Sequence, residues 1–515
     1  MSRGVSRRWF IGGLASFGAF GGSRVFGAAP GAYSNGTPKV TFGVVSDVHI
    51  RLAASGEGFF KGFDASTFVH TLEWFRDQGV DAVMIAGDIA DKGLVKELQY
   101  VADAWFSVFP DDRAPDGRHV QRLFVYGNHD YEGFNYGGYA KKIWPDAEER
   151  ARNVLRTDQK ANWEAIFHEE FSPVMRWQVN GYTFVGAHWT ADKCRGWGET
   201  GIAGIEEFFD ANAAKLDPGK PFFFFQHPHP KDTCYGSWAW GHDDGRATRA
   251  LANFPNAVAF SGHSHTSLTH EMSIWQGEFT SLGTSSLSYT GGAYSRARNP
   301  MGYENGGGTA EFDPYKVMTG YGSTRDGRQG MLVRVYDSHI SFSRREFVYD
   351  QSLGEDWVLP LPAAEPKPFS FVEHARRSVA PEFPSGAELL VSRARAKNRG
   401  AAAKGAAAAV PSEEKDVYVL DFPAATAAKG GRAFDYEIVA VPKGEGPKVK
   451  RYMMADGYNM SPDNPRARRP LTCRIAADQL PQGVEFRFAV RPVNSLGKPG
   501  RPIVSGWQQA VKSLI

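Results

Sequence analysis

The chain has 515 residues, of which 42% are hydrophobic and 23% are charged, a composition typical of a globular protein with about two to four domains. The aromatic share of 13% excludes a largely disordered chain. The formal net charge of +2 depends on residues 1–29, which contain four arginines and no acidic residue. The other residues carry 55 basic and 57 acidic side chains, so we expect no nucleic-acid-binding surface.

Residues 1–29 have the layout of a twin-arginine export signal. Arg7 and Arg8 directly precede an apolar, glycine-rich stretch at 11–22, and small residues at 27–29 suit cleavage. The alternative is a short membrane anchor, but this stretch is short and glycine-rich for a hydrocarbon core about 30 Å thick. We therefore expect a periplasmic or secreted protein with no stable membrane span after cleavage.

Strand-like and helix-like segments alternate from residue 38 to residue 285, which predicts an α/β sheet covered by helices. The predicted strands are 39–46, 81–86, 122–126, 221–226 and 258–261, and the predicted helices are 64–78 and 93–108. The segments 174–179 and 182–187 flank Asn180-Gly181, a dipeptide that favours a β-hairpin.

The remaining chain predicts a long loop and a second domain. Residues 284–330 are rich in Gly, Tyr, Ser and Asn, as in a functional or disordered loop. A hairpin at 331–348 closes the first domain, which we expect at 38–350, and a proline-rich linker covers 351–368. Residues 369–515 contain short strands and a low-complexity insertion at 393–415. Their stretch 486–500 resembles the last strands of fibronectin type III modules, which implies a small all-β sandwich.

Polar side chains of metal-binding types follow directly on five strand-like runs. The motifs are Asp47-Val-His49, Gly87-Asp88, Gly127-Asn128-His129-Asp130, His227 and Gly262-His263-Ser-His265. Residues just past the carboxyl ends of strands line the crevice of open α/β sheets, so we expect these side chains at one edge. Imidazole nitrogens and carboxylate oxygens suit divalent Mn, Fe, Co or Zn, and two such ions can clamp a displacement at phosphorus.

In this order and spacing, the five motifs resemble those of the calcineurin-like metallophosphoesterase superfamily over residues 39–285. The resemblance implies an α/β fold, a four-layer α/β/β/α sandwich, here followed by the small all-β domain. It also implies hydrolysis of a phosphodiester or phosphomonoester by a hydroxide that bridges two divalent metal ions.

The resemblance further implies two metal sites that share the carboxylate of Asp88. The ligands of the first ion would be Asp47, His49, Asp88 and His265. The ligands of the second ion would be Asp88, Asn128, His227 and His263. His129 would be catalytic and protonate the leaving oxygen, and Asp130 would orient His129.

Taken singly, these residues have simpler interpretations, such as a strand-end cap for Asp47 or turn residues for Asp88 and Asn128. Only their joint occurrence favours a metal site. His227 is nearer the strand end than His229, so we prefer His227 as the ligand, and His229 would reach the substrate.

Purple acid phosphatases resemble this chain in combining such a catalytic domain with a fibronectin-like module. They carry Tyr three residues after the bridging Asp, where this chain has Asp91, and Gly where it has His49. A tyrosinate-bound ferric ion is therefore not expected, and the pattern is closer to the phosphodiesterase-type branches.

Several other residues have two interpretations. Aromatic residues after the motifs either stack on the substrate or pack the loops: Tyr131, Phe134, Tyr136, Trp189, Trp238, Trp240, Tyr289, Tyr294 and Tyr303. Arg246 and Arg249 either hold phosphate or form a solvated helix face. Cys194 and Cys234 form a disulfide, or they and Cys473 are unpaired thiols.

The function that fits best is a metal-dependent hydrolase of a small-molecule or polymer phosphate ester. The alternative is a catalytically silent exported protein that contacts a cell-surface glycan or protein through its fibronectin-like module. A silent scaffold is free to lose ligands, whereas this chain retains every expected ligand, so we favour the enzyme.

Overall fold

The computed structural model describes residues 25–26, 36–51, 65–190, 201–236, 241–290, 327–363, 365–397, 414–426, 432–455 and 457–509, without the side chains of 25–26 and 136–140. Most of the predicted export signal, of the loop at 284–330 and of the insertion at 393–415 lies outside the described residues. The same holds for the side chains of Cys194, Trp238, Trp240, Tyr136, Tyr294 and Tyr303. Within the described ranges, every helix is too short or too polar to cross a membrane.

The first sheet contains the strands that precede three of the five motifs. β2 (Val40–Val45), β3 (Ala82–Ala86) and β4 (Gln121–Val125) pair in parallel. The antiparallel strands β11 (Gln329–Val335), β12 (His339–Glu346) and β14 (Asp356–Pro360) extend the sheet beyond β2. β1 (Val25–Phe26) pairs with β14, and β13 (Gln351–Ser352) pairs with β12. Part of the predicted linker at 351–368 is therefore strand.

The second sheet contains the strands that precede the other two motifs. β6 (Tyr182–Ala187), β7 (Phe222–Phe225), β8 (Ala257–Ser261) and β10 (Thr280–Gly283) are parallel. β5 (Val174–Val179) and β9 (Ile274–Gln276) pair antiparallel at the two edges. Asn180 and Gly181 form the predicted turn between β5 and β6, with positive φ angles of 50° and 79°.

The two sheets share one apolar core in which aromatic rings meet edge to face. The ring of Phe42 on β2 lies 5.1 Å from that of Phe184 on β6 and 4.9 Å from that of Phe223 on β7. All four phenylalanines of β7 are buried, because alternate side chains enter this core and the core behind the second sheet. This packing holds the carboxyl ends of both sets of parallel strands at one edge.

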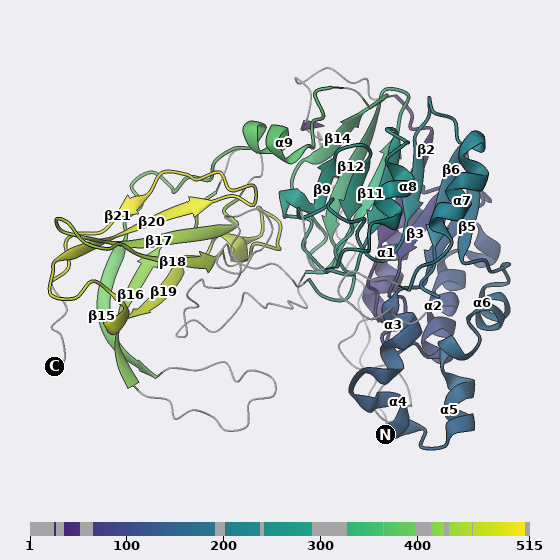
Figure 1. The fold of residues 1–515 in the computed structure, drawn as a ribbon, viewed down its shortest axis with the longest axis horizontal. Helices are drawn as coiled ribbons and strands as arrows, with labels where there is room; N and C mark the ends of the chain where they lie inside the picture. Colours follow the sequence, from purple (N-terminus) through teal and green to yellow (C-terminus); the bar gives the residue numbers. More distant parts are fainter. Residues whose placement is uncertain are drawn as a thin grey trace, which may run out of the picture.

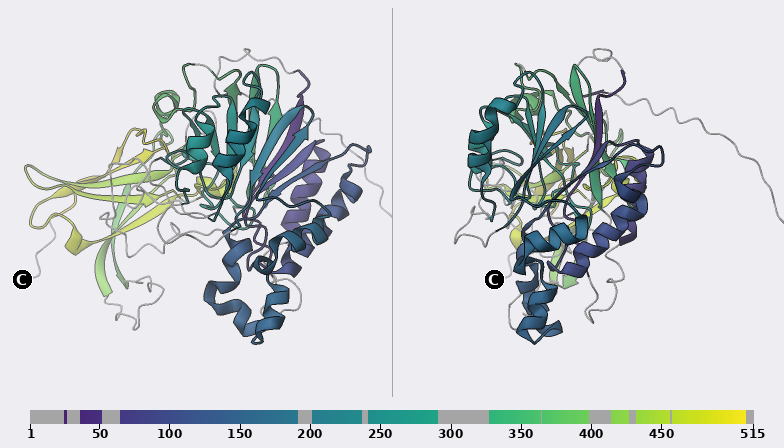
Figure 2. Two further views of the ribbon diagram at one scale, coloured as in Figure 1. Left: turned by 45° about the vertical axis from the view of Figure 1, so that its right-hand side comes forward. Right: turned by 90° about the vertical axis from the view of Figure 1, so that its right-hand side faces the viewer.

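Helices bury apolar side chains against the outer face of each sheet. Those on the first sheet are α1 (Ala65–Asp77), α2 (Val95–Val108) and α6 (Gln159–Phe167). Those on the second sheet are α7 (Ile205–Asn212) and α8 (Arg246–Leu251). Three short helices follow β4, namely α3 (Asn128–Glu132), α4 (Tyr139–Ile143) and α5 (Ala147–Asn153). The right-hand view of Figure 2 shows helices on both sides of the two sheets.

The C-terminal region is rich in antiparallel sheets and follows helix α9 (Phe371–Arg377). One sheet contains β15 (Leu390–Lys397), β16 (Glu414–Phe422) and β19 (Leu471–Ala476). The other contains β17 (Asp435–Pro442), β18 (Val449–Met454), β20 (Phe486–Val493) and β21 (Ile503–Val504). Both sheets contribute to one apolar core, and the region lies beside the α/β region in Figure 1.

Replacing Phe42 with Ala should lower the free energy of unfolding by about 3–5 kcal/mol, because it leaves a cavity between the two sheets. Urea unfolding followed by tryptophan fluorescence measures this loss. Val372→Ala is the control, because the side chain of Val372 is 83% exposed and should be replaceable with little effect. Equal stability of the two variants would contradict the shared core.

Candidate metal centre

The predicted ligands lie at the carboxyl ends of β2, β3, β4, β7 and β8, on one edge of the paired sheets. Five of them adopt the left-handed backbone conformation that non-glycine residues rarely take. Their φ angles are 50° for Asp47, 48° for His49, 52° for Asp88, 68° for His263 and 54° for His265. Such conformations cost on the order of 1–3 kcal/mol each and are concentrated at functional sites.

The first group of side chains contains Asp47, His49, Asp88 and His265, all buried. Asp47 Oδ1 lies 2.8 Å from His265 Nε2 and 3.7 Å from His49 Nε2. His49 Nε2 also lies 3.6 Å from Asp88 Oδ2 and 3.1 Å from His265 Nε2. One ligand atom from each of the four residues fits within 4.8 Å of the others, the size of a single-ion site.

The second group contains Asp88, His227 and His263, whose ligand atoms also lie within 4.8 Å of one another. His227 Nε2 is 3.0 Å from Asp88 Oδ2 and 3.1 Å from His263 Nδ1. Asn128 is buried at the start of α3, and the N–H of His129, the next residue, donates to Asp88 Oδ1 at 2.8 Å. The structure thus brings six of the seven predicted ligands into two adjacent groups that share Asp88, and Asn128 is buried next to the residue whose N–H contacts that carboxylate.

Two motif glycines allow this close approach. A Cβ atom on Gly127 would overlap Asp88 Oδ1, and a Cβ atom on Gly262 would overlap Asp47 Oδ2. Both positions therefore require glycine because another motif's carboxylate passes directly over the backbone. The ligands and these glycines form one packed unit.

The donor atoms of this edge fit divalent cations. Asp47 Oδ1 is buried and makes no hydrogen bond of acceptable geometry, although imidazole nitrogens surround it. Burial favours the neutral carboxyl, but His265 and His227 hold the pKa of Asp47 well below its usual range. In turn, burial opposes protonation of His227, but Asp88 and Asp47 raise its pKa to about 9. These buried carboxylates therefore create a strong local demand for positive charge.

The contact that orients His129 differs from the prediction. His129 Nδ1 donates to the carbonyl oxygen of Asp91 at 2.8 Å, and the Asp91 carboxylate lies 3.8 Å away. The carboxylate of Asp130 instead accepts from the N–H groups of Ala90 at 2.7 Å, Gly127 at 2.7 Å and Ile89 at 3.1 Å. Asp130 thus ties the loops after β3 and β4 together, and Asp91 positions His129.

Asp91 is a residue of the site that the sequence analysis missed. Arg51 donates to both of its carboxylate oxygens, at 2.6 and 2.8 Å, and His49 Nδ1 lies 3.3 Å from Asp91 Oδ1. Burial would raise the pKa of Asp91, but His49 and Arg51 hold it well below its usual range. The available indication was its position three residues after Asp88, which we used only to exclude tyrosine.

The histidine that competed with His227 has another role. His229 is fully buried, and its ring nitrogens lie 2.7 Å from Ser261 Oγ and 2.8 Å from Ser264 Oγ. It therefore supports the loop after β8, and the expectation that it reaches the substrate is wrong. His188 is also buried and accepts from the N–H of Tyr126 at 3.1 Å.

The other residues with two interpretations mostly pack locally. The rings of Tyr131 and Phe134 contact the guanidinium of Arg156, at 4.8 and 5.6 Å. Tyr289 lies at the metal centre, with its ring 4.3 Å from that of His265. Buried or surface contacts account for the remaining described residues: Trp189, Cys234 and Cys473 are buried, Arg246 pairs with Asp244, and Arg249 pairs with Glu206.

Residues 40–267 match the family model described as calcineurin-like phosphoesterase. The matched range contains all five motifs and supports metal-dependent hydrolysis of a phosphoester. A search of the curated proteins found no match.

Three solved structures illustrate what the chain is similar to. A dimetal phosphatase from Danio rerio aligns at 12% identity over 63% of this chain and 99% of that chain, with a TM-score of 0.34. A purple acid phosphatase from yellow lupin (Lupinus luteus) seeds aligns at 15% identity over 62% and 53%, with a TM-score of 0.34. A predicted phosphoesterase from Streptococcus pneumoniae aligns at 13% identity over 62% and 97%, with a TM-score of 0.24.

Asp130→Asn should lower the free energy of unfolding by about 1.5–3 kcal/mol, because the new amide group faces a buried backbone N–H. Chemical denaturation of the metal-free protein measures the loss. The matched control is Asp116→Asn, which changes a surface carboxylate and should leave stability nearly unchanged. Wild-type stability of Asp130→Asn would show that this carboxylate does not hold the two loops.

Proposed function

We propose that this chain, whose residues 40–267 form a calcineurin-like phosphoesterase domain, hydrolyses a phosphodiester with two divalent metal ions bound at the sheet edge. The observation that carries the proposal is the convergence of two groups of ligand atoms, each within 4.8 Å, that share Asp88. A carboxylate between two cations suits an in-line displacement at phosphorus.

The proposed ligands follow the two groups. Those of the first ion are Asp47, His49, Asp88 and His265. Those of the second ion are Asp88, Asn128, His227 and His263. Because the donors are imidazole nitrogens, carboxylate oxygens and one amide, we expect Mn, Fe, Co or Zn. When bound, two such ions supply positive charge to the phosphoryl oxygens and lower the pKa of a water molecule.

His129 is the proposed proton donor to the leaving oxygen. Its Nδ1 proton is held by the Asp91 carbonyl, so proton transfer by this ring uses Nε2. Burial lowers the pKa of His129 to about 4, although the carboxylate of Asp88 opposes this. A phosphate ester bound beside Nε2 would favour the protonated ring through its negative charge, and the role of proton donor requires that form.

Three observations support the finer parts of the proposal. A diester is favoured because position 91 is Asp and His49 is present, as in the phosphodiesterase-type branches. The two sheets with their outer helices suit the four-layer α/β/β/α sandwich, and the C-terminal sheets suit a fibronectin type III-like module at 369–515. The paired arginines before the apolar stretch at 11–22 favour export to the periplasm or medium.

Asp88→Asn should lose tight binding of the second metal equivalent, because an amide cannot bridge two cations as a carboxylate does. Turnover should fall by more than the roughly 10–100-fold typical of outer-shell changes. Isothermal titration with Mn²⁺ and a steady-state assay measure both effects. Asp77→Asn is the control, because this carboxylate is 63% exposed. Two tight equivalents and full turnover in Asp88→Asn would refute the bridging role.

Turnover of bis-p-nitrophenyl phosphate should exceed that of p-nitrophenyl phosphate when Mn²⁺ is supplied. His129→Ala should lower it by roughly 100-fold or more, as expected for loss of a general acid. The surface variant His119→Ala should match the wild type. Preference for the monoester would overturn the diester assignment, and metal binding with no turnover of either ester would favour the silent binding protein.

A further inference from the structure

A short segment behind the metal centre, residues 284–290, contacts two of the proposed ligands. The hydroxyl of Ser286 and the N–H of Ser288 donate to the carbonyl oxygen of Asp47, at 3.0 and 3.1 Å. His265 Nδ1 lies 3.1 Å from the carbonyl oxygen of Tyr289, so it donates there and presents Nε2 to the metal site. The position of this backing segment therefore fixes the backbone of Asp47 and the ring of His265.

The C-terminal region holds the far end of the backing segment. Asn459 Nδ2 donates to the hydroxyl of Thr290 at 2.8 Å, and both residues are almost fully buried. The hydroxyl of Thr269 donates to the carbonyl oxygen of Tyr458. A Cβ atom on Gly327 would overlap both Thr290 Oγ1 and Asn459 Nδ2, so the backbone packs closely against this contact.

Gln329 joins the loop that carries Asn459 to the segments that contain Leu268 and Ser285. Its Nε2 donates to the carbonyl oxygen of Asn459 at 2.7 Å, and its Oε1 accepts from the N–H of Leu268 at 2.8 Å and from Ser285 Oγ at 3.2 Å. Leu268 lies three residues after His265, and Ser285 belongs to the backing segment. One buried amide thus connects the C-terminal region to the loop that carries His265 and to the backing segment.

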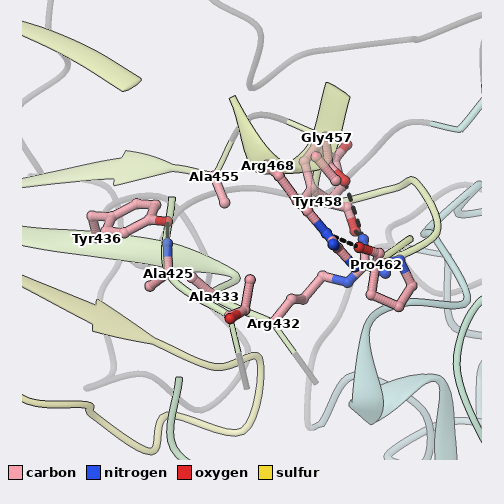
Figure 3. A pocket seen from close by; sticks show the side chains of 11 residues that line it. Ala425, Arg432, Ala433, Tyr436, Ala455, Gly457, Tyr458, Pro462 and Arg468 are labelled. Atoms are coloured by element: carbon pink, nitrogen blue, oxygen red, sulfur yellow. Dashed lines mark hydrogen bonds between the residues drawn. The ribbon is translucent and has the colours of Figure 1, made fainter. Parts of the chain in front are cut away.

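The loop that carries Asn459 is itself held in shape from within the C-terminal region. Arg432 Nη1 donates to the carbonyl oxygens of Gly457 and Tyr458, both at 3.1 Å. Figure 3 shows Arg432 reaching toward these residues across a small hollow also lined by Tyr436 and Ala455. Because these hydrogen bonds hold the loop in place, the loop can in turn fix the position of the backing segment that it contacts.

We propose that the loop at 457–461 is a working part of the metal centre and that Asn459 is a positioning residue for His265 and Asp47. The inference rests on the proposed function, because it concerns the ligands of the first ion. Asn459 holds Thr290, Thr290 fixes the end of the backing segment, and that segment orients both ligands. The C-terminal region is then a structural partner of the catalytic domain.

Asn459→Ala in the full chain tests this role against a matched interface variant, Asn464→Ala. Asn464 is equally buried and donates to Gln351 Oε1 at 3.2 Å, but Gln351 lies on β13, outside the backing segment. We expect Asn459→Ala to weaken Mn²⁺ binding at one of two sites about 10-fold, as outer-shell changes do, with Asn464→Ala within about 2-fold of wild type. Isothermal titration at a temperature where circular dichroism shows both variants folded gives the comparison.

A second pair of variants keeps the test decisive if Asn459→Ala does not fold. Thr290→Val removes the acceptor hydroxyl at nearly constant volume, whereas Thr290→Ser retains it, so only Thr290→Val should lose Mn²⁺ affinity. Equal Mn²⁺ affinity and equal kcat in both comparisons would overturn the positioning role. In that case the wild type would still bind two Mn²⁺ ions and hydrolyse the ester. A wild type that binds no Mn²⁺ would overturn the proposed function and this inference together.

Discussion

The metal centre is organised around the attraction between two buried carboxylates and the imidazole rings that surround them. Asp47 and Asp88 are almost completely removed from water, and such carboxylates are stable only where positive charge is close. Imidazoles meet this demand in part, and two divalent ions would meet it in full. The site therefore needs strand ends that deliver both carboxylates, and the five ring or amide side chains proposed as ligands, to the same place.

The fold meets this requirement by placing the carboxyl ends of two sets of parallel strands at one edge. The shared aromatic core around Phe42 fixes the distance between the sheets, so ligands from β2 and β8 reach the same point. Local backbone features then determine the exact positions of the side chains. Five candidate ligands adopt the left-handed backbone conformation, and glycines leave room for the carboxylates of Asp47 and Asp88. Asp130 also contributes, because its carboxylate holds together the loops after β3 and β4, which carry Asp88 and Asn128.

The sequence predicted the sheet strands and the clustering of candidate ligands at their ends because both depend on local pattern. An apolar run followed by Asp-x-His or His-x-His indicates where a strand ends and which candidate metal ligands follow it. The partner of His129 could not be predicted in this way, since Asp130 is its neighbour in sequence, whereas Asp91 lies 38 residues away and only the fold brings it to the ring. Asn459 lies 169 residues from Thr290, so no local pattern could indicate that contact.

The contact through Asn459 also changes how the C-terminal region is understood. Removing a module joined only by a linker would leave the metal centre unchanged. Here, Tyr458 and Asn459 share buried hydrogen bonds with the segments around His265. The C-terminal region could still bind a glycan or protein in this arrangement. Such binding would then affect a metal centre to which the region is connected by hydrogen bonds.

The most direct test of the central claim is anomalous diffraction from crystals grown with Mn²⁺. The account predicts two peaks about 3.5–4 Å apart, one among Asp47, His49, Asp88 and His265 and one beside Asp88, His227 and His263. A single peak, or a peak among His49, Asp91 and His129, would contradict a dinuclear centre bridged by Asp88.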